Sequence, residues 1–322
     1  MKKQIKISFA IIILLTLISA TISAYGIKGE NSNPGEAHQQ NNETGWYYLP
    51  SYSNYAPNGL PDFDQRGQND WKSRIIIWSY CAPTSLADIF WWFDSKNSDL
   101  NGTPGDGKDD FPLVRDYNAP GVPNPGPYSD DHNFNNVNSR ETPSKKGELS
   151  GELIERIAWY INHNNKQGKL RFFFWGGTKT YDMKKGVQRW LEDSGLENKY
   201  NVEQQSKPSF SYICQKLRGD LGIVLLLRFN NPFIRFYPMF CGHYVAVAGV
   251  NQRDGYIALS DPFLNTVNPD PTPLEHNNPS VVSHDVYKID STSPRMLRAS
   301  WWLPGYSYTG AYATYAFVIS EV

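Results

Sequence analysis

The sequence predicts an α+β domain, in which helices come first and an antiparallel sheet follows. Segments with a helical pattern lie at residues 81–93, 152–162, 182–194 and 210–218. Apolar runs that suit buried strands lie at residues 223–227, 244–250 and 256–260, with further strand patterns at 286–289 and 315–319. Because helices and strands do not alternate, a doubly wound parallel sheet is not expected.

The amino terminus has the pattern of a secretory signal peptide over residues 1–24. A start with three lysines precedes an apolar run at about residues 7–22, and small residues follow it. The run is short for a membrane-spanning helix, although an uncleaved anchor is the alternative. We therefore expect a secreted or extracytoplasmic protein, anchored to the membrane if the signal stays uncleaved.

Residues 25–58 are rich in Asn, Gly, Ser, Pro and Gln, and we interpret them as a flexible spacer before a single domain at 59–322. The formal net charge is −1 and no block of Lys or Arg is present, which gives no support to nucleic-acid binding. No later segment is long and apolar enough to span a bilayer, so no membrane contact is expected after removal of the signal.

A loop-rich insertion rich in Asn, Asp, Gly and Pro is predicted at about residues 95–147. Its acidic cluster at residues 101–110 offers oxygen ligands of the kind that Ca²⁺ prefers. The cluster lacks the terminal Glu spacing of an EF-hand loop, so a solvated loop is the simpler interpretation. No Cys or His pair has zinc-ligand spacing. No cofactor is therefore expected, with Ca²⁺ in the insertion as the alternative.

The first predicted helix opens with Cys-Ala-Pro-Thr-Ser at residues 81–85. Pro83 suits a first helical turn, where its missing N–H is not needed. Cys81 would lie at the positive end of the helix, where a thiolate is stabilised. Taken alone, this stretch fits an inert buried thiol equally well.

The chain has three cysteines, Cys81, Cys214 and Cys241. In an oxidising compartment the economical arrangement is a Cys214–Cys241 disulfide that leaves Cys81 free. Three free thiols in a reducing setting are the equally open alternative.

Of the six histidines, only His243 stands at the head of a strong strand pattern. Residues 244–250 and 256–260 are expected to form a hairpin, which brings Asp261 back toward the start of the first strand. Asp261 can then accept the ring N–H of His243 and hold the other ring nitrogen toward Cys81. The sequence therefore predicts a thiol, a base and an orienting carboxylate in one site.

His284 and Asp285 form a rival base–carboxylate pair. Adjacent residues of a strand point to opposite faces, so Asp285 is poorly placed to orient His284. We favour His243 as the base.

These motifs resemble those of papain-like cysteine peptidases, in particular the bacteriocin-processing double-glycine peptidases and their secreted relatives. That family shows Cys-Gly-Pro-Thr/Val-Ser/Ala at the start of a helix, Gly-His-Tyr/Trp-Val-Val-Val-x-Gly on a strand, and Asp-Pro at the end of the next strand. The corresponding stretches here are Cys-Ala-Pro-Thr-Ser at 81–85, Gly-His-Tyr-Val-Ala-Val-Ala-Gly at 242–249 and Ser-Asp-Pro at 260–262.

The resemblance implies a papain-like fold, with the catalytic Cys at the N-terminus of a helix packed on an antiparallel sheet that carries the His and the Asp. It further implies that Cys81 is the nucleophile, that His243 is the general base and then acid, and that Asp261 orients His243. The substrate would be a peptide or protein, cleaved through a thioester acyl-enzyme.

The oxyanion would be bound by the backbone N–H of Cys81 and by a side-chain donor. The family places a Gln six residues before its Cys, where this chain has Ile75. Gln68 is our candidate donor, and we interpret Gln65 as an ordinary surface amide. Ala82 replaces the usual Gly and adds a methyl group beside the predicted oxyanion hole.

Two classes of function follow. The first is an exported cysteine peptidase or amidase, with a peptidyl transferase as its close variant. The second is a non-catalytic module on the same fold that binds a peptide or a surface polymer. The side-chain oxyanion donor is the feature that discriminates between them.

Overall fold

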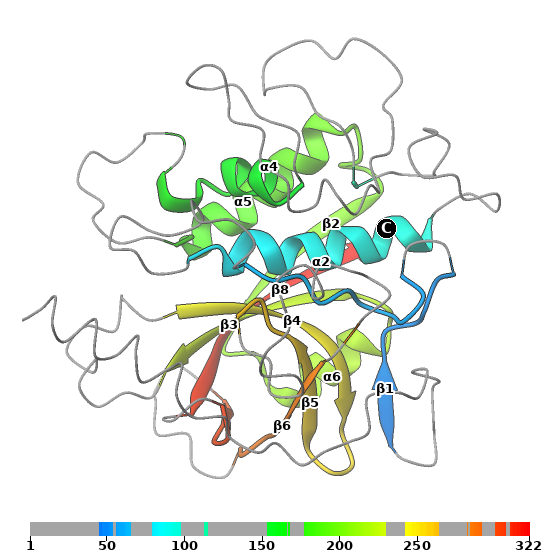
Figure 1. Cartoon of the computed structure of the whole chain (residues 1–322), viewed down its shortest axis with the longest axis vertical. Helices are drawn as coiled ribbons and strands as arrows, with labels where there is room; N and C mark the ends of the chain where they lie inside the picture. Colours follow the sequence, from blue (N-terminus) through cyan, green and yellow to red (C-terminus); the bar gives the residue numbers. More distant parts are fainter. Residues whose placement is uncertain are drawn as a thin grey trace, which may run out of the picture.

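The structure is a computed structural model (Figure 1). It describes residues 45–53, 56–65, 79–97, 113–114, 153–165, 167, 177–229, 242–263, 282, 284–291, 300–306 and 310–322. The predicted signal peptide at 1–24, the acidic cluster at 101–110, Gln68 and Cys241 lie outside the described residues.

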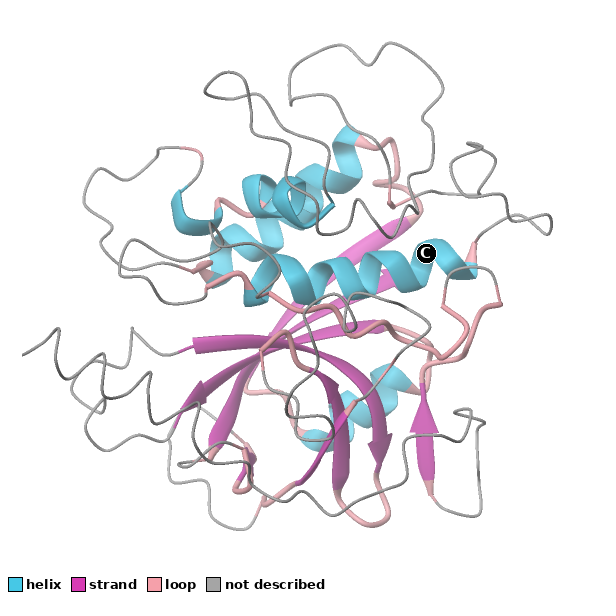
Figure 2. Ribbon diagram, viewed as in Figure 1, coloured by secondary structure: helices cyan, strands magenta, loops and turns pink. Residues whose placement is uncertain are grey.

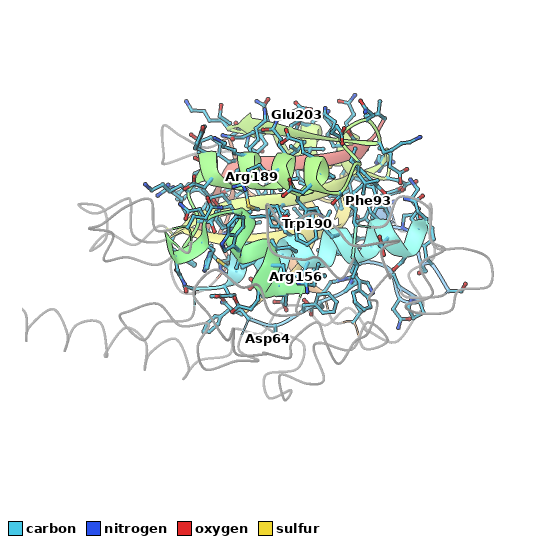
Figure 3. All side chains as sticks on the ribbon, turned by 90° about the horizontal axis from the view of Figure 1, so that it is seen from above. Asp64, Phe93, Arg156, Arg189, Trp190 and Glu203 are labelled. Carbon is cyan, nitrogen blue, oxygen red and sulfur yellow. The ribbon has the colours of Figure 1, made fainter. Side chains whose placement is uncertain are left out.

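The helices of the described part are α2 (Cys81–Lys96), α4 (Leu153–Tyr160), the 3-10 helix η2 (His163–Asn165), α5 (Thr180–Asp193) and α6 (Phe210–Leu217). Helices α4 and α5 form a layer over α2, and the sheet lies on the other side of α2 (Figures 1 and 2). Figure 3 looks down on this layer and labels Arg156 on α4 and Trp190 on α5.

The sheet has the strand order β2 (Tyr200–Ser206), β8 (Ala311–Glu321), β3 (Gly222–Phe229), β4 (Gly242–Asn251), β5 (Tyr256–Ser260) and β6 (Asp285–Lys288). Two short strands join it, β1 (Trp46–Tyr48) beside β4 and β7 (Trp302–Leu303) beside β8. Every pairing between these strands is antiparallel. The coarse prediction of helices with an antiparallel sheet is therefore confirmed.

Helix α2 is buried on all sides, and not only on the face that its apolar period indicates. All of its residues from Cys81 to Ser95 are buried. One side packs on the sheet and another on α4, while the segment before the helix covers part of the rest. There the indole N–H of Trp92 donates to the carbonyl of Pro50 at 2.9 Å, and the rings of Trp91 and Phe63 meet edge to face.

The end of the predicted spacer belongs to the fold, which corrects the prediction for residues 46–48. They form β1, which pairs with the far end of β4. The ring of Tyr48 lies directly over Gly249, where an added Cβ would be 2.4 Å from a ring carbon. A short aromatic strand with little periodicity gives too weak a pattern to be distinguished from a linker.

Part of the predicted insertion at 95–147 is also held against the core. The backbone N–H groups of Leu113 and Val114 both donate to the buried carboxylate of Asp94 on α2. The indole N–H of Trp190 donates to the carbonyl of Leu113 at 3.2 Å, which ties this short segment to α5.

The β4–β5 hairpin forms as the sequence predicts. Ala246 is the register partner of Ser260, and Asn251 is the partner of Tyr256. Gly255 has a φ of +73° in the connecting turn, and its N–H donates to the carbonyl of Asn251. No helix among the described residues has both the length and the apolar character that a membrane crossing requires.

Candidate active site

Cys81 is the first residue of α2 and is 7% exposed. Its Sγ lies 4.0 Å from the carbonyl oxygen of Ser79. Tyr80 occupies the N-cap position, and its side chain makes no capping hydrogen bond. The Tyr80 side chain therefore does not occupy the N–H groups of the first turn, and the positive end of the helix dipole acts on the Cys81 thiol.

His243 is the second residue of β4, and Asp261 directly follows β5. The ring Nε2 of His243 lies 2.7 Å from Oδ1 of Asp261. Cys81 lies close enough to the ring to raise the pKa of His243. Because Nε2 faces Asp261, Nδ1 is the ring nitrogen that is left for an interaction with the thiol. The structure thus brings together the three side chains that the sequence singled out.

The charge of His243 depends on its two neighbours. Burial, the largest influence, lowers the pKa of the imidazole. The charges of Asp261 and Cys81, together with their hydrogen bonds, outweigh burial and raise the pKa of His243 to about 10. The raised pKa favours the imidazolium form of the ring, which is the form that pairs with a thiolate.

Asp261 is itself held by a full set of donors. The backbone N–H of Phe263 donates to Oδ1 at 2.9 Å, and the hydroxyl of Tyr306 donates to Oδ2. Asp261 is 3% exposed, so these donors satisfy a charge that water hardly reaches. Sequence reasoning missed Tyr306, because residues 304–307 (Pro-Gly-Tyr-Ser) carry no periodicity or motif that links them to Asp261.

Gln65 is not the surface amide that we expected from the sequence. It is 3% exposed, and its backbone N–H donates to the carbonyl of Pro262 at 2.8 Å. Its Oε1 is enclosed and has no hydrogen-bond partner in the described part of the chain. The prediction was wrong because Gln65 lies in a segment held from both sides, at Pro262 by its own N–H and at Asp88 of α2 by the N–H of Phe63.

Two buried carboxyl groups meet on one hydroxyl behind the site. The Oγ of Ser260 lies 2.9 Å from Oδ1 of Asp62 and 3.1 Å from Oδ2 of Asp88. A hydroxyl has a single proton to donate, so the second bond needs a proton on a carboxyl group. Burial and the charge of Asp62 raise the pKa of Asp88 well above its ordinary value, although the N–H of Phe63 opposes them. The raised pKa favours the protonated form of Asp88 in this cluster.

The rival pair takes part in separate contacts. Nε2 of His284 lies 2.8 Å from the carbonyl oxygen of Leu60, and its ring stacks on Tyr48. Burial, and then the charge of Asp285, raise the pKa of Tyr287 well above its ordinary value. His284 therefore fastens the segment before α2 to the sheet.

Cys214 is a free thiol with no exposed surface. Burial is the main reason that the pKa of this thiol is raised to about 11. The expected pairing with Cys241 is therefore not made by Cys214 in this structure. Within the described ranges no group of three or more His, Cys, Asp or Glu residues could hold a metal ion.

Comparison with known proteins gives little beyond the geometry. No protein-family model matches the chain, and no curated protein matches it. Among solved structures, the chain is similar to the crystal structure of a Bacillus anthracis protein provisionally described as a C39-like peptidase. The two are 12% identical, the match covers 70% of this chain and 92% of the other, and the TM-score is 0.28. A likeness at that TM-score carries no argument about activity.

Proposed function

We propose that this protein is a cysteine peptidase or amidase. The observation that carries the proposal is the buried His243–Asp261 pair, which stands beside a thiol at the start of a helix. An inert core thiol needs neither a charged imidazole nor a carboxylate that fixes the ring. The same pair gives no advantage to a module that only binds a peptide.

In the proposed reaction the Cys81 thiolate attacks the carbonyl carbon of a peptide bond, and the carbonyl electron pair moves onto oxygen. The tetrahedral intermediate collapses and expels the amine, which takes the proton from His243. A thioester and a neutral imidazole remain. His243 then removes a proton from water as the water oxygen attacks the thioester, and release of the carboxylic acid restores the thiolate–imidazolium pair.

We propose the backbone N–H of Cys81 and the side-chain amide of Gln65 as the donors to the oxyanion. We propose Gln65 in place of Gln68, because Gln65 is buried. Its backbone N–H also donates to the carbonyl of Pro262, the residue after Asp261. A donor that is already fixed before the reaction costs no reorganisation when the negative charge develops. The amino-terminal pattern at residues 1–24 supports the proposal that the reaction takes place outside the cytoplasm.

The test combines turnover with labelling of the thiol. The full chain is incubated with a peptide library, and new termini are identified by mass spectrometry beside a Cys81→Ala control. In parallel, Cys81 is alkylated with iodoacetamide over a range of pH in a Cys214→Ala/Cys241→Ala background, where it is the only thiol. We expect cleavage that is lost in Cys81→Ala, and alkylation well below pH ~8.5, where an ordinary thiol ionises.

His243→Ala should remove the alkylation at low pH and leave only the reaction of an ordinary thiol. If wild type and Cys81→Ala give the same peptide products, or if alkylation needs high pH or unfolding, the proposal fails.

A further inference from the structure

We infer that Tyr306 is a positioning residue for Asp261, and that its hydroxyl fixes the carboxylate that orients His243. The inference rests on the proposed function. It assigns a role in the site to the segment at 300–306, which begins some 40 positions after Asp261, the last of the other site residues in the chain.

The two carboxylate oxygens of Asp261 have different hydrogen-bond partners. Oδ1 faces Nε2 of His243 at 2.7 Å and also accepts the N–H of Phe263 at 2.9 Å. Oδ2 accepts the hydroxyl of Tyr306. A carboxylate held at one oxygen only can turn about its terminal torsion, which is a soft one. The Tyr306 hydroxyl stops this rotation and keeps Oδ1 aimed at the ring.

The hydroxyl of Tyr306 is a dependable donor at this place. Burial, and then the charge of Asp261, raise the pKa of Tyr306 well above its ordinary value. The phenol therefore keeps its proton over the whole working range of a thiol enzyme. The titratable groups that face Tyr306 are Asp261, Tyr287 and Asp285, and those that face His243 are Asp261 and Cys81.

Tyr306 is also held in place and shields the site. It has no exposed surface, and its N–H donates to the carbonyl of Leu303 at the end of β7. Its ring lies 5.0 Å from that of Tyr287 and 6.0 Å from that of Phe229, measured between centroids. The centroid of the His243 ring is 6.4 Å away. His243 is 8% and Asp261 3% exposed, and such a dry surrounding strengthens the electrostatics of the bond between them.

The test is a double-mutant cycle in the full chain, with turnover of the library peptide that wild type cleaves fastest. Tyr306→Phe should lower kcat by about tenfold to a hundredfold and leave KM unchanged, which corresponds to the loss of one hydrogen bond to a charged group. In an Asp261→Ala background the same substitution should have no further effect, because the hydroxyl then has no carboxylate to hold.

Tyr160→Phe is the matched control. Tyr160 is also a buried tyrosine whose hydroxyl donates to a carboxylate, that of Asp193 at 2.8 Å, but it lies on α4 away from the site. It should lower the melting temperature without changing kcat. If Tyr306→Phe loses kcat equally with and without Asp261, or keeps the kcat of wild type, the inference is overturned.

Two further experiments are decisive. If Tyr306→Phe does not fold, 3-fluorotyrosine at position 306 keeps the packing and makes the hydroxyl a stronger donor. A kcat unchanged by the fluorine then overturns the inference, and a changed kcat supports it. If His243→Ala leaves Cys81 alkylation unaltered, the proposed function fails and Tyr306 has no base to serve. If His243→Ala removes that alkylation but Tyr306→Phe behaves as Tyr160→Phe does, only the inference about Tyr306 falls.

Discussion

Asp261→Asn separates the charge of this carboxylate from its shape. The amide keeps an acceptor oxygen for the ring N–H of His243 and for the N–H of Phe263. Its NH₂ group can donate to the oxygen of Tyr306, which has lone pairs to accept. The imidazole therefore keeps its orientation and its tautomer, and the substitution removes little besides the negative charge.

The magnitude follows from the pKa of His243, which lies at about 10 against an ordinary 6.5. That difference corresponds to about 5 kcal/mol of preference for the imidazolium, at roughly 1.36 kcal/mol for each pH unit. Asp261 is the larger of the two charges that produce it, and Cys81 is the other. Loss of Asp261 should remove on the order of half of this preference, and the imidazolium should lose its proton roughly two pH units lower.

The sign of the effect is specific. An elevated pKa of His243 keeps the ion pair intact below that pKa, and the pair is lost as pH rises through it. In Asp261→Asn the basic limb of the kcat/KM profile should therefore move to lower pH. We would measure this limb with the best library peptide, beside an NMR titration of the His243 ring.

Asp193→Asn is the control, since it removes a carboxylate charge that also accepts a tyrosine hydroxyl but stands at the end of α5 and not beside the His243 ring. The basic limb of the kcat/KM profile of Asp193→Asn should lie at the same pH as that of wild type. A basic limb in Asp261→Asn that coincides with that of wild type would refute the reasoning, because Asp261 would then contribute no charge stabilisation to His243.

Three other substitutions test the remaining features of the site and the fold. Gln65→Ala should lower kcat by about a hundredfold to a thousandfold while iodoacetamide labelling of the thiol stays unchanged, and an unchanged kcat would rule out its role as an oxyanion donor. Asp88→Asn should flatten the pH dependence of the free energy of unfolding, measured with urea. Burial raises the pKa of the Asp88 carboxyl above 3.8 in the folded state, so wild type loses stability as pH rises above that value. A slope equal to that of wild type would contradict a neutral Asp88. Gly186→Ala should cost about 1–3 kcal/mol in the same assay, because the new Cβ would lie 2.6 Å from the backbone of Ile161 on the neighbouring segment. Gly219→Ala, whose nearest neighbour is at 3.4 Å, should cost less, and equal losses would refute the packing argument.

The part of the site that could be predicted from the sequence is the part encoded locally. Cys81 opens a helix whose first turn contains Pro83, and this pattern depends only on neighbours in the chain. The pairing of His243 with Asp261 follows from a hairpin, because a tight turn between two apolar strands fixes which residues return to the same end.

The residues that sequence reasoning missed all act across long separations in the chain. Tyr306 meets Asp261 only because the last strands return to the sheet beside β3. Gln65 is buried only because its segment is held between α2 and the end of β5. Neither contact leaves a periodic trace, so composition and spacing could not distinguish these side chains from surface residues.

Asp88 is the exception, because its signal was present in the sequence. It is a carboxyl group within a run of apolar and aromatic residues, and a buried carboxyl needs a partner. Asp88 follows Cys81 by seven positions, so both side chains lie on the same face of α2. Along that face Cys81 meets His243 and Asp88 meets Ser260, which directly precedes Asp261. Two contacts nearly two turns apart thus add to the packing that holds this helix on all sides. We therefore expect the buried carboxyl of Asp88 to help hold α2 in the position that presents Cys81 to His243.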